Sequence, residues 1–368
     1  MKIICNTARL NEACQNVQRA VSSKATMPII EGILMKAADG QVQLTGYDMD
    51  MGITTVQEAR VEEEGAIVLN ARLLCDILRR LPGETVSIEA DARLQCTIRC
   101  GEVEYQLVGN DAKEYPELPT VSEEVPVIID SETLEKMVKQ TIFAVSTNDT
   151  KVVHTGIKFE VSANTLKLIA VDGFRLAIRT EAINYTGEPL SFVVPAKTLS
   201  EVIKLINEAE VVALKVAARH IVFEVGAYAL ISRLLDGEFL DYNAAIPKAH
   251  STEVEVDTKT IISAIDRMSL MISDRVKSPL RCIFDENVIR MSTSTTIGAA
   301  NDKVPAKIDG NRVEIGFNNR FLLDAFRACD LDTVKVTLNG PLSPITVVPV
   351  EGDSFLFLVL PVRLRNEK

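Results

Sequence analysis

The chain has 368 residues, of which 47% are hydrophobic and 25% are charged, and its formal net charge is −11. This composition is typical of a globular protein and excludes the disordered and fibrous classes. The acidic balance also argues against tight, sequence-independent adhesion to nucleic acid through bulk charge, so any DNA role must use local basic patches or topology.

The sequence predicts neither a membrane span nor a secretory signal. The longest uninterrupted apolar run, 355–360, has the length of a strand and is too short for a bilayer. Only three apolar residues lie between Lys2 and Asn6, so the apolar core of a signal peptide is missing. Seven cysteines without a C-x-x-C pair fit a reducing compartment. We therefore expect a cytoplasmic protein.

The first 22 residues form a pattern that returns twice, with copies that begin at residues 1, 125 and 252. Each copy has five strand-like residues, a capping Asn or Asp, a hydroxyl residue, and apolar or small side chains at i, i+3, i+4, i+7 and i+11. This order predicts a strand followed by an amphipathic helix. The spacing between copies far exceeds the roughly 20–50 residues of a solenoid repeat, so each repeat is domain-sized. The predicted caps are Asn6, Asp130 and Asp257.

After the first helix, 33–35 and 42–44 read as strands around Asp39-Gly40, a dipeptide that favours a two-residue hairpin turn. The next stretch, Asp48-Met49-Asp50, has a D-x-D spacing that could suggest a metal site. No third carboxylate or histidine falls in register with it. A solvated strand face is therefore favoured over a metal site.

A second helix is predicted in each copy. Asn70 caps the first of them, over Ala71–Leu81, and Pro82-Gly83 ends it. One column in the first turn is basic in all three copies, although the macrodipole favours acids there. Two interpretations are open: three solvated surface charges, or three helix ends that face one shared anion, which we favour. The basic column consists of Arg72, Lys197 and Arg320.

Linkers with prolines and few periodic apolar residues follow the first two copies, at 118–125 and 243–251. We therefore expect three modules. Each contains two helices and about eight strands, so the fold class is α+β with antiparallel sheets. The predicted modules are residues 1–120, 125–247 and 252–368.

The sequence contains no catalytic constellation. It has no P-loop, no G-x-G-x-x-G, no H-E-x-x-H and no G-x-S-x-G motif, and its three histidines lie far apart. We therefore expect no enzyme activity, no cofactor and no metal. A repeat scaffold without a DNA role would share the triplication but would not need the basic column, and it stays open as the alternative.

Three stretches, Thr26–Ile29, Val171–Ala177 and Leu360–Leu364, carry a resemblance to the bacterial DNA polymerase III beta subunit family, the sliding clamps. The resemblance extends over essentially the whole chain. It implies a DNA clamp fold in which two chains join head to tail into a closed ring of six modules, with the helices around a central hole. Twelve helices about 10 Å across would enclose a hole of roughly 35–40 Å, wide enough for duplex DNA. It also implies a clamp that encircles DNA and tethers the replicative polymerase for processivity.

The resemblance further implies three groups of site residues. The DNA-facing positions are Lys24, Arg72, Lys151 and Lys197. The homodimer interface is expected to contain Tyr105, Leu107, Met271 and Ile272. A pocket between the second and third modules would bind short peptides of the polymerase, the clamp loader and repair proteins. Its matching residues are His154, Val171, Gly173, Phe174, Arg175, Leu176, Ala245, Ile246, Leu342, Pro344, Leu358, Leu360, Pro361, Val362 and Arg363.

Three features depart from the family pattern. Phe174 stands where a histidine is common, and Leu240 replaces the proline of the linker motif. Val152 and Val153 follow Lys151 where some relatives have aromatic residues, so base stacking is not expected there. Without the resemblance, the Gly-Phe-Arg-Leu turn and the apolar last strand would be interpreted as parts of a core.

Overall fold

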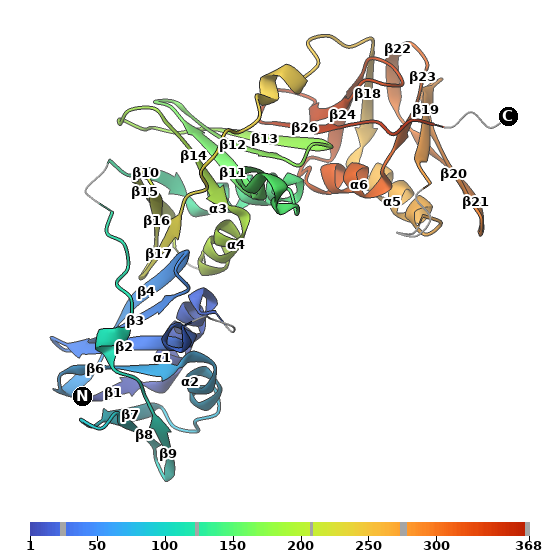
Figure 1. The fold of residues 1–368 in the computed structure, drawn as a ribbon. Coiled ribbons are helices and arrows are strands. Elements are labelled where there is room, and N and C mark those ends of the chain that lie inside the picture. Colours follow the sequence, from blue (N-terminus) through green and yellow to red (C-terminus); the bar gives the residue numbers. More distant parts are fainter. Residues whose placement is uncertain (23–26, 122–124, 207–208, 273–277, 365–368) are drawn as a thin grey trace. The chain divides into compact units, whose positions relative to one another are not determined.

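The computed structural model describes residues 1–22, 27–121, 125–206, 209–272 and 278–364 (Figure 1). The chain forms two compact units, Met1–Glu132 with Lys197–Leu234 and Thr133–Ala196 with Leu235–Lys368. Within the described residues no helix is long and apolar enough to cross a membrane. The α-helices are α1 Thr7–Val17, α2 Ala71–Leu78, α3 Ser131–Lys139, α4 Ala196–Leu205, α5 Thr258–Ser269 and α6 Asn319–Arg327. Short 3-10 turns are η1 Gln18–Ala20, η2 Pro28–Glu31, η3 Ala112–Glu114, η4 Ile142–Ala144, η5 Asp149–Thr155 and η6 Tyr242–Ala245.

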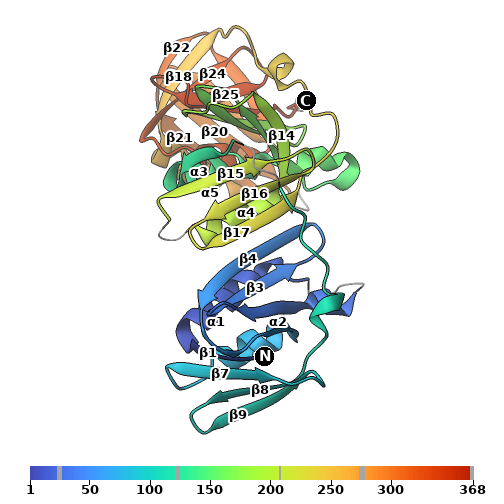
Figure 2. The same cartoon turned by 90° about the vertical axis from the view of Figure 1, so that its left-hand side faces the viewer.

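The first unit contains two antiparallel sheets. Its strands are β1 Lys2–Asn6, β2 Gly32–Ala38, β3 Gln41–Tyr47, β4 Met51–Glu58, β5 Arg60–Glu63, β6 Gly65–Asn70, β7 Thr85–Ala90, β8 Gln95–Cys100, β9 Val103–Val108, β10 Val127–Asp130, β15 Val211–Val216, β16 His220–Val225 and β17 Tyr228–Arg233. One sheet has the order β5-β1-β7-β8-β9 and the other β10-β15-β16-β17-β4-β3-β2-β6. Helix α1 packs on α2 and on β3 and β4, which places the helices on one side of these strands (Figure 2).

The second unit also contains two antiparallel sheets. Its strands are β11 Gly156–Val161, β12 Thr165–Val171, β13 Arg175–Ala182, β14 Leu190–Pro195, β18 Thr252–Asp257, β19 Leu280–Asp285, β20 Val288–Thr295, β21 Gly298–Pro305, β22 Lys307–Gly310, β23 Val313–Phe317, β24 Thr333–Leu338, β25 Ile345–Pro349 and β26 Phe355–Val359. The sheet orders are β14-β11-β12-β13-β26-β25-β24-β18-β22 and β21-β20-β19-β23. Helix α5 packs on α6, β20 and β21.

The predicted strand–helix repeat and the α+β class are confirmed. β1–α1, β10–α3 and β18–α5 have the predicted order. Two of the predicted caps accept the expected hydrogen bond. The backbone N–H of Arg9 donates to Asn6 Oδ1 (3.0 Å), and that of Thr260 donates to Asp257 Oδ1 (2.7 Å). The first four predicted helix columns are buried in every copy, because they form the face that packs on the sheet. These residues are Leu10, Ala13, Cys14, Val17, Leu134, Met137, Val138, Thr141, Ile261, Ala264, Ile265 and Met268.

Two local predictions need correction, whereas the hairpin at Asp39-Gly40 is confirmed by the pairing of Ala38 with Gln41. Helix α2 ends at Leu78 rather than Leu81, because the chain tightens into i→i+3 hydrogen bonds before Pro82, a residue that disfavours helix at the position before it. Asp48 does not lie on a strand face. Its Oδ1 accepts hydrogen bonds from the N–H groups of Asp50 (3.1 Å) and Met51 (2.8 Å), so the D-x-D stretch is the turn between β3 and β4. The described residues contain no cluster of three His, Cys, Asp or Glu suited to a metal.

Both large sheets run across a boundary between predicted modules. In the first unit, β4 pairs with β17 from Met51–Ser232 to Thr55–Tyr228, and we call this pairing the first joint. In the second unit, β13 pairs with β26 from Arg175–Val359 to Arg179–Phe355, and we call this pairing the second joint. Because each half of the predicted second module shares a sheet with a neighbour, the two compact units divide this module between them.

Candidate functional site

All predicted peptide-binding residues lie in the second unit, and the β12–β13 turn holds several of them. Gly173 has φ 89°, in the left-handed region that favours glycine. The carboxylate of Asp172 accepts hydrogen bonds from the N–H groups of Phe174 (2.9 Å) and Arg175 (3.0 Å). This local pattern fixes the turn, because an Asp side chain can replace a backbone acceptor there.

A cluster of buried apolar residues lies next to the turn. Val171, Leu176 and Leu358 are 4%, 2% and 3% exposed, and they form a cluster with Ile169, Ile178 and Tyr242. Phe239, Ile246 and Leu356 pack against this cluster while remaining partly buried. Three of the predicted site residues therefore do finish a core, and they support a site from below.

Several other predicted peptide-binding residues expose apolar side chains. Phe174 is 59% exposed and Leu342 is 66% exposed. Leu360 and Val362 are also exposed, and the backbone ties their segment down: Leu360 N–H donates to Phe174 O (2.9 Å) and Val362 N–H to Gly316 O (2.8 Å). A set of exposed apolar groups beside a fixed turn suits a binding surface better than scattered single residues would. The remaining members are exposed Ala245 and Arg363 and half-buried Ile246, Pro344 and Pro361.

Arg175, one of the predicted peptide-binding residues, is held by contacts within the protein. Its Nε donates to Asp172 Oδ2 (2.9 Å) and its Nη1 to Asp324 Oδ2 (2.6 Å). Its guanidinium carbon lies 4.6 Å from the ring centroid of Phe321, on which Phe174 stacks at 5.8 Å. The side chain is 12% exposed. Arg175 therefore pins the turn to α6, an arrangement that the sequence could not show because Asp324 lies 149 residues away.

His154 is buried at the end of η5. Its ring contacts Phe239 edge to face at a centroid distance of 5.2 Å, and its Nε2 has no hydrogen-bond partner among the described residues. Burial, and then the charge of Lys151, lower the pKa of His154 below the ordinary histidine value. The ring is therefore neutral at physiological pH.

The predicted DNA-facing residues differ in their surroundings. Arg72 is exposed in the first turn of α2 and pairs with no described carboxylate. Lys197, in the first turn of α4, donates to Asp48 Oδ2 at 2.8 Å, and the Asp48 side chain is only 10% exposed. Lys151 is exposed in η5, whereas Lys24 lies outside the described residues. Of these helix positions, Arg72 thus has no carboxylate partner among the described residues, whereas the charge of Lys197 is partly neutralised.

The predicted dimer residues lie beside two sheet edges. β9 is an outer strand of the five-stranded sheet, with Tyr105 37% exposed and Leu107 half-buried. β21 is an outer strand of the four-stranded sheet, and Met271 and Ile272 follow α5 in the same unit. Sequence reasoning missed three strongly exposed apolar neighbours, although an apolar residue at a helix end or in a turn is a signal that could have found them. They are Val108, Leu270 and Ile297.

Family models match the chain almost end to end. The N-terminal, central and C-terminal domain models of the DNA polymerase III beta subunit match residues 1–119, 128–241 and 243–363. The chain is 32% identical to the beta sliding clamp of Bacillus subtilis (strain 168), over 99% of this chain and 100% of that protein. It is 32% identical to the beta sliding clamp of Synechococcus elongatus, over 100% of both.

Solved structures agree with this similarity. The crystal structure of the DNA polymerase sliding clamp from Bacillus subtilis matches with a TM-score of 0.97 and 32% identity, over 99% of this chain and 100% of that chain. A structure described as a putative DNA polymerase III beta subunit from Eubacterium rectale matches with a TM-score of 0.95 and 31% identity, over 99% and 100% of the two chains.

Proposed function

This chain belongs to the DNA polymerase III beta subunit family, and on that premise we propose that it is a sliding clamp that encircles duplex DNA and tethers the replicative polymerase. The family consists of processivity factors rather than enzymes. We keep the three predicted modules, residues 1–120, 125–247 and 252–368, as the repeating units of the ring. A clamp that acts on chromosomal DNA works in the bacterial cytoplasm.

The ring proposal rests on the strand pairing at the two joints, where equivalent strands of neighbouring modules pair in the same way. β4, β13 and β21 are equivalent eight-residue strands, and β9, β17 and β26 are equivalent partners. The first joint uses β4 with β17 and the second joint uses β13 with β26. β21 and β9 are outer strands, each with one edge that pairs with no other described strand. Pairing β21 of one chain with β9 of a second chain follows the same rule and closes a ring of two chains.

The same register gives the proposed dimer joint in detail. By equivalence with the first joint, Leu107 lies opposite the partner's Gly298 and Tyr105 lies opposite the partner's Ala300. Met271 and Ile272, with exposed Leu270 and Ile297, supply apolar surface beside that edge. An unpaired strand edge is a ready template for another strand, so burial in a dimer also explains how this edge is protected.

A closed ring reconciles a net charge of −11 with a DNA partner. Enclosure retains the duplex without base contacts, and basic residues need only position the phosphates. We propose Arg72, Lys151 and Lys197 for this role, together with Lys24. Because Asp48 already neutralises part of the charge of Lys197, Arg72 contributes more than Lys197.

The exposed apolar residues at the second joint are the proposed docking site for short peptides of the polymerase, the clamp loader and repair proteins. Exposed apolar side chains next to an ordered turn can accept the Leu or Phe anchors of an extended peptide. The contributing side chains are those of the turn, the linker and the C-terminal segment described above. The fixed geometry of Arg175 favours binding without a large rearrangement of the turn.

The ring is tested by retention on DNA. We expect the protein, loaded by a clamp loader, to remain on closed circular DNA and to leave linear DNA through its ends. A scaffold without a DNA role would be retained on neither form of DNA. Light scattering should give a mass near twice 40.4 kDa. Replacing both Met271 and Ile272 by Ala should populate monomers, because each buried large-to-Ala change costs about 2–5 kcal/mol. An unchanged dimer dissociation constant contradicts the proposed interface.

The groove is tested with a substitution on an exposed side chain. A deletion from Val362 onward would not test the docking site alone. It would also remove the contacts that Val362 and Leu364 make with Gly316 of β23. Leu342→Asp leaves the fold intact, since this side chain is 66% exposed, and should abolish binding of a polymerase-derived peptide in calorimetry. Leu331→Asp, at an exposed apolar residue of the same unit outside the groove, is the control. Equal affinity in both variants contradicts the placement.

A further inference from the structure

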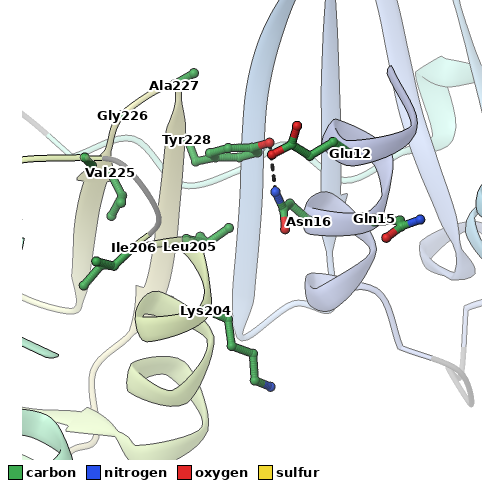
Figure 3. A pocket seen from close by; sticks show the side chains of 11 residues that line it. Glu12, Gln15, Asn16, Lys204, Leu205, Ile206, Val225, Gly226, Ala227 and Tyr228 are labelled. Atoms are coloured by element: carbon green, nitrogen blue, oxygen red, sulfur yellow. Dashed lines mark hydrogen bonds between the residues drawn. The ribbon is translucent and has the colours of Figure 1, made fainter. Parts of the chain in front are cut away.

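The side chains that cross from one module to the next differ between the two joints. At the first joint, Asn16 Nδ2 of α1 donates to the hydroxyl of Tyr228 (2.9 Å), and both residues border a cavity of about 420 Å³ (Figure 3). At the second joint, Lys136 of α3 stands at the helix position of Glu12 of α1, and its ammonium pairs with Asp330. Because each joint has its own cross-module contact, we expect the proposed dimer joint to have one as well.

The strand register of the joints extends to one further pair of residues. At the second joint this pair follows the end of β26, where the Thr180 N–H donates to Ser354 O at 2.8 Å. The pair at the same place of the first joint is Val56 with Ala227. Both pairs consist of uncharged residues, so neither joint within the chain has an ion pair at this place.

In the register of the proposed dimer joint, the same place holds two opposite charges. Tyr105 lies opposite the partner's Ala300. Three residues further along the two strands, Glu102 therefore lies opposite the partner's Lys303. Side chains that lie opposite each other on antiparallel strands have Cβ atoms about 4.5–5.5 Å apart, which is close enough for an ion pair.

The cation of this pair is not neutralised within its own chain. Lys303 is exposed on β21 and forms no ion pair with any other described residue. Its cross-strand neighbour on β20 is a second cation, Arg290, which pairs with Glu286 at 2.7 Å. A carboxylate from outside the chain would therefore find the Lys303 ammonium available.

The anion is available in the same way. Glu102 is exposed in the turn between β8 and β9, and it pairs with no cation in the part of the chain that the structure describes. Arg99 on β8 already pairs with Glu104 (2.7 Å) and Glu89 (3.6 Å). The two outer strands thus carry an available carboxylate and an available ammonium at matching positions.

We propose that Glu102 of one chain forms an ion pair with Lys303 of the other, and that this pair favours a second copy of the chain as the partner. The inference rests on the proposed ring, in which the pair occurs twice. The joints within the chain form between modules that are already linked, whereas the dimer joint must bring separate chains together. Opposite charges across an interface increase the specificity and the rate of such an encounter.

Charge reversal in the full-length protein tests the ion pair. Lys303→Glu and Glu102→Lys each place like charges opposite one another at both joints of a homodimer, whereas a heterodimer of the two variants has opposite charges at both joints. Lys307→Glu on β22 and Glu58→Lys on β4 are controls with the same changes in charge at exposed residues. Analytical ultracentrifugation measures the dimer dissociation constant. Native mass spectrometry with one variant isotopically labelled measures the share of heterodimers in an equimolar mixture.

Each reversal of the pair should raise the dimer dissociation constant by at least about fivefold, because an attractive pair becomes a repulsive pair twice in each dimer. Each control should change it by less than about twofold. In the mixture, heterodimers should greatly exceed the statistical half of all dimers.

The outcomes separate the ion pair from the ring. A wild-type chain that stays monomeric at micromolar concentration overturns the ring and the ion pair together. A wild-type dimer whose reversal variants behave like the controls overturns the ion pair alone, as does a statistical share of heterodimers.

Discussion

The first and second joints share one strand register but differ in the side chains that fill it. At the first joint, equivalent positions hold Met51 and Leu230. At the second joint they hold Arg175 and Phe357, and Phe357 contacts the rings of Phe355 and Phe143 at 4.8 and 5.4 Å. The helix side differs as well, because the second joint has a Lys136–Asp330 ion pair where the first has a cavity.

This difference teaches that backbone pairing and side-chain chemistry vary independently along a repeat. Backbone hydrogen bonds between antiparallel strands are the same for almost any side chain, so the register repeats. Packing and charge then specialise each joint. The second joint becomes an aromatic, rigid platform with exposed apolar groups beside it, whereas the first joint keeps a polar turn and an open cavity.

The largest expected effect concerns the aromatic packing. Phe357→Ala should reduce the free energy of unfolding by about 3–5 kcal/mol, because the ring is fully buried and two other rings lose a contact. Urea denaturation measures this loss. Leu230→Ala, at the equivalent position of the first joint, is the matched comparison at about 2–5 kcal/mol. If the leucine variant loses as much as the phenylalanine variant, the aromatic cluster adds nothing beyond ordinary burial.

The next effect concerns the pinned turn. Arg175→Ala should cost about 1.5–3 kcal/mol, because hydrogen bonds to charged groups are lost and Asp172 keeps a nearly buried carboxylate. Arg175→Lys should recover only part of the loss, since an ammonium cannot reproduce the two-carboxylate geometry and the ring contact. Both are measured by denaturation with peptide affinity as a second readout. Full stability of the lysine variant would show that charge alone holds the turn.

A smaller effect concerns the pH dependence of the stability, which we expect to depend on His154. His154 stands at the position that Ile30 occupies in the first copy of the repeat, and its pKa is lowered by burial and by Lys151. The unfolded chain therefore binds a proton more readily, near pH 6.5, than the folded chain does. Stability is fully present above about that value and is lost as pH falls through it. His154→Ile, which copies the residue of the first module, should flatten this loss in urea titrations between neutral and mildly acidic pH. A profile equal to that of the wild type argues against this prediction.

The smallest effect concerns the DNA-facing lysine of the first joint. Asp48→Asn removes the negative charge that pairs with Lys197, and an ion pair with a solvent-exposed ammonium is worth about 0.2–1 kcal/mol. Binding to a short duplex at low salt should therefore tighten by less than about fivefold. Asp50→Asn, in the same turn but without this pair, is the control for net charge. Fluorescence anisotropy decides the matter, and identical gains in both variants would show that only net charge changed.

Much of the local fold could be predicted because its determinants lie within one or two turns of chain. The caps Asn6 and Asp257, the buried columns of α1, α3 and α5, and the Asp39-Gly40 hairpin depend on near neighbours. The prediction for Asp48 was wrong, since an isolated D-x-D spacing does not distinguish a strand face from a turn whose carboxylate accepts backbone N–H groups.

The sequence by itself determined the triplication, the α+β class and the family, because helix and strand periodicities and short motifs are written in adjacent residues. Only the tertiary structure decided that Asp324 holds Arg175 and that Asp48 holds Lys197, each across 149 residues. It also decided that Glu12 borders a cavity while Lys136 closes its equivalent place. The physical reason is that the partner of each side chain depends on which strands and helices meet in the folded protein. A local sequence pattern contains no information about a partner 149 residues away.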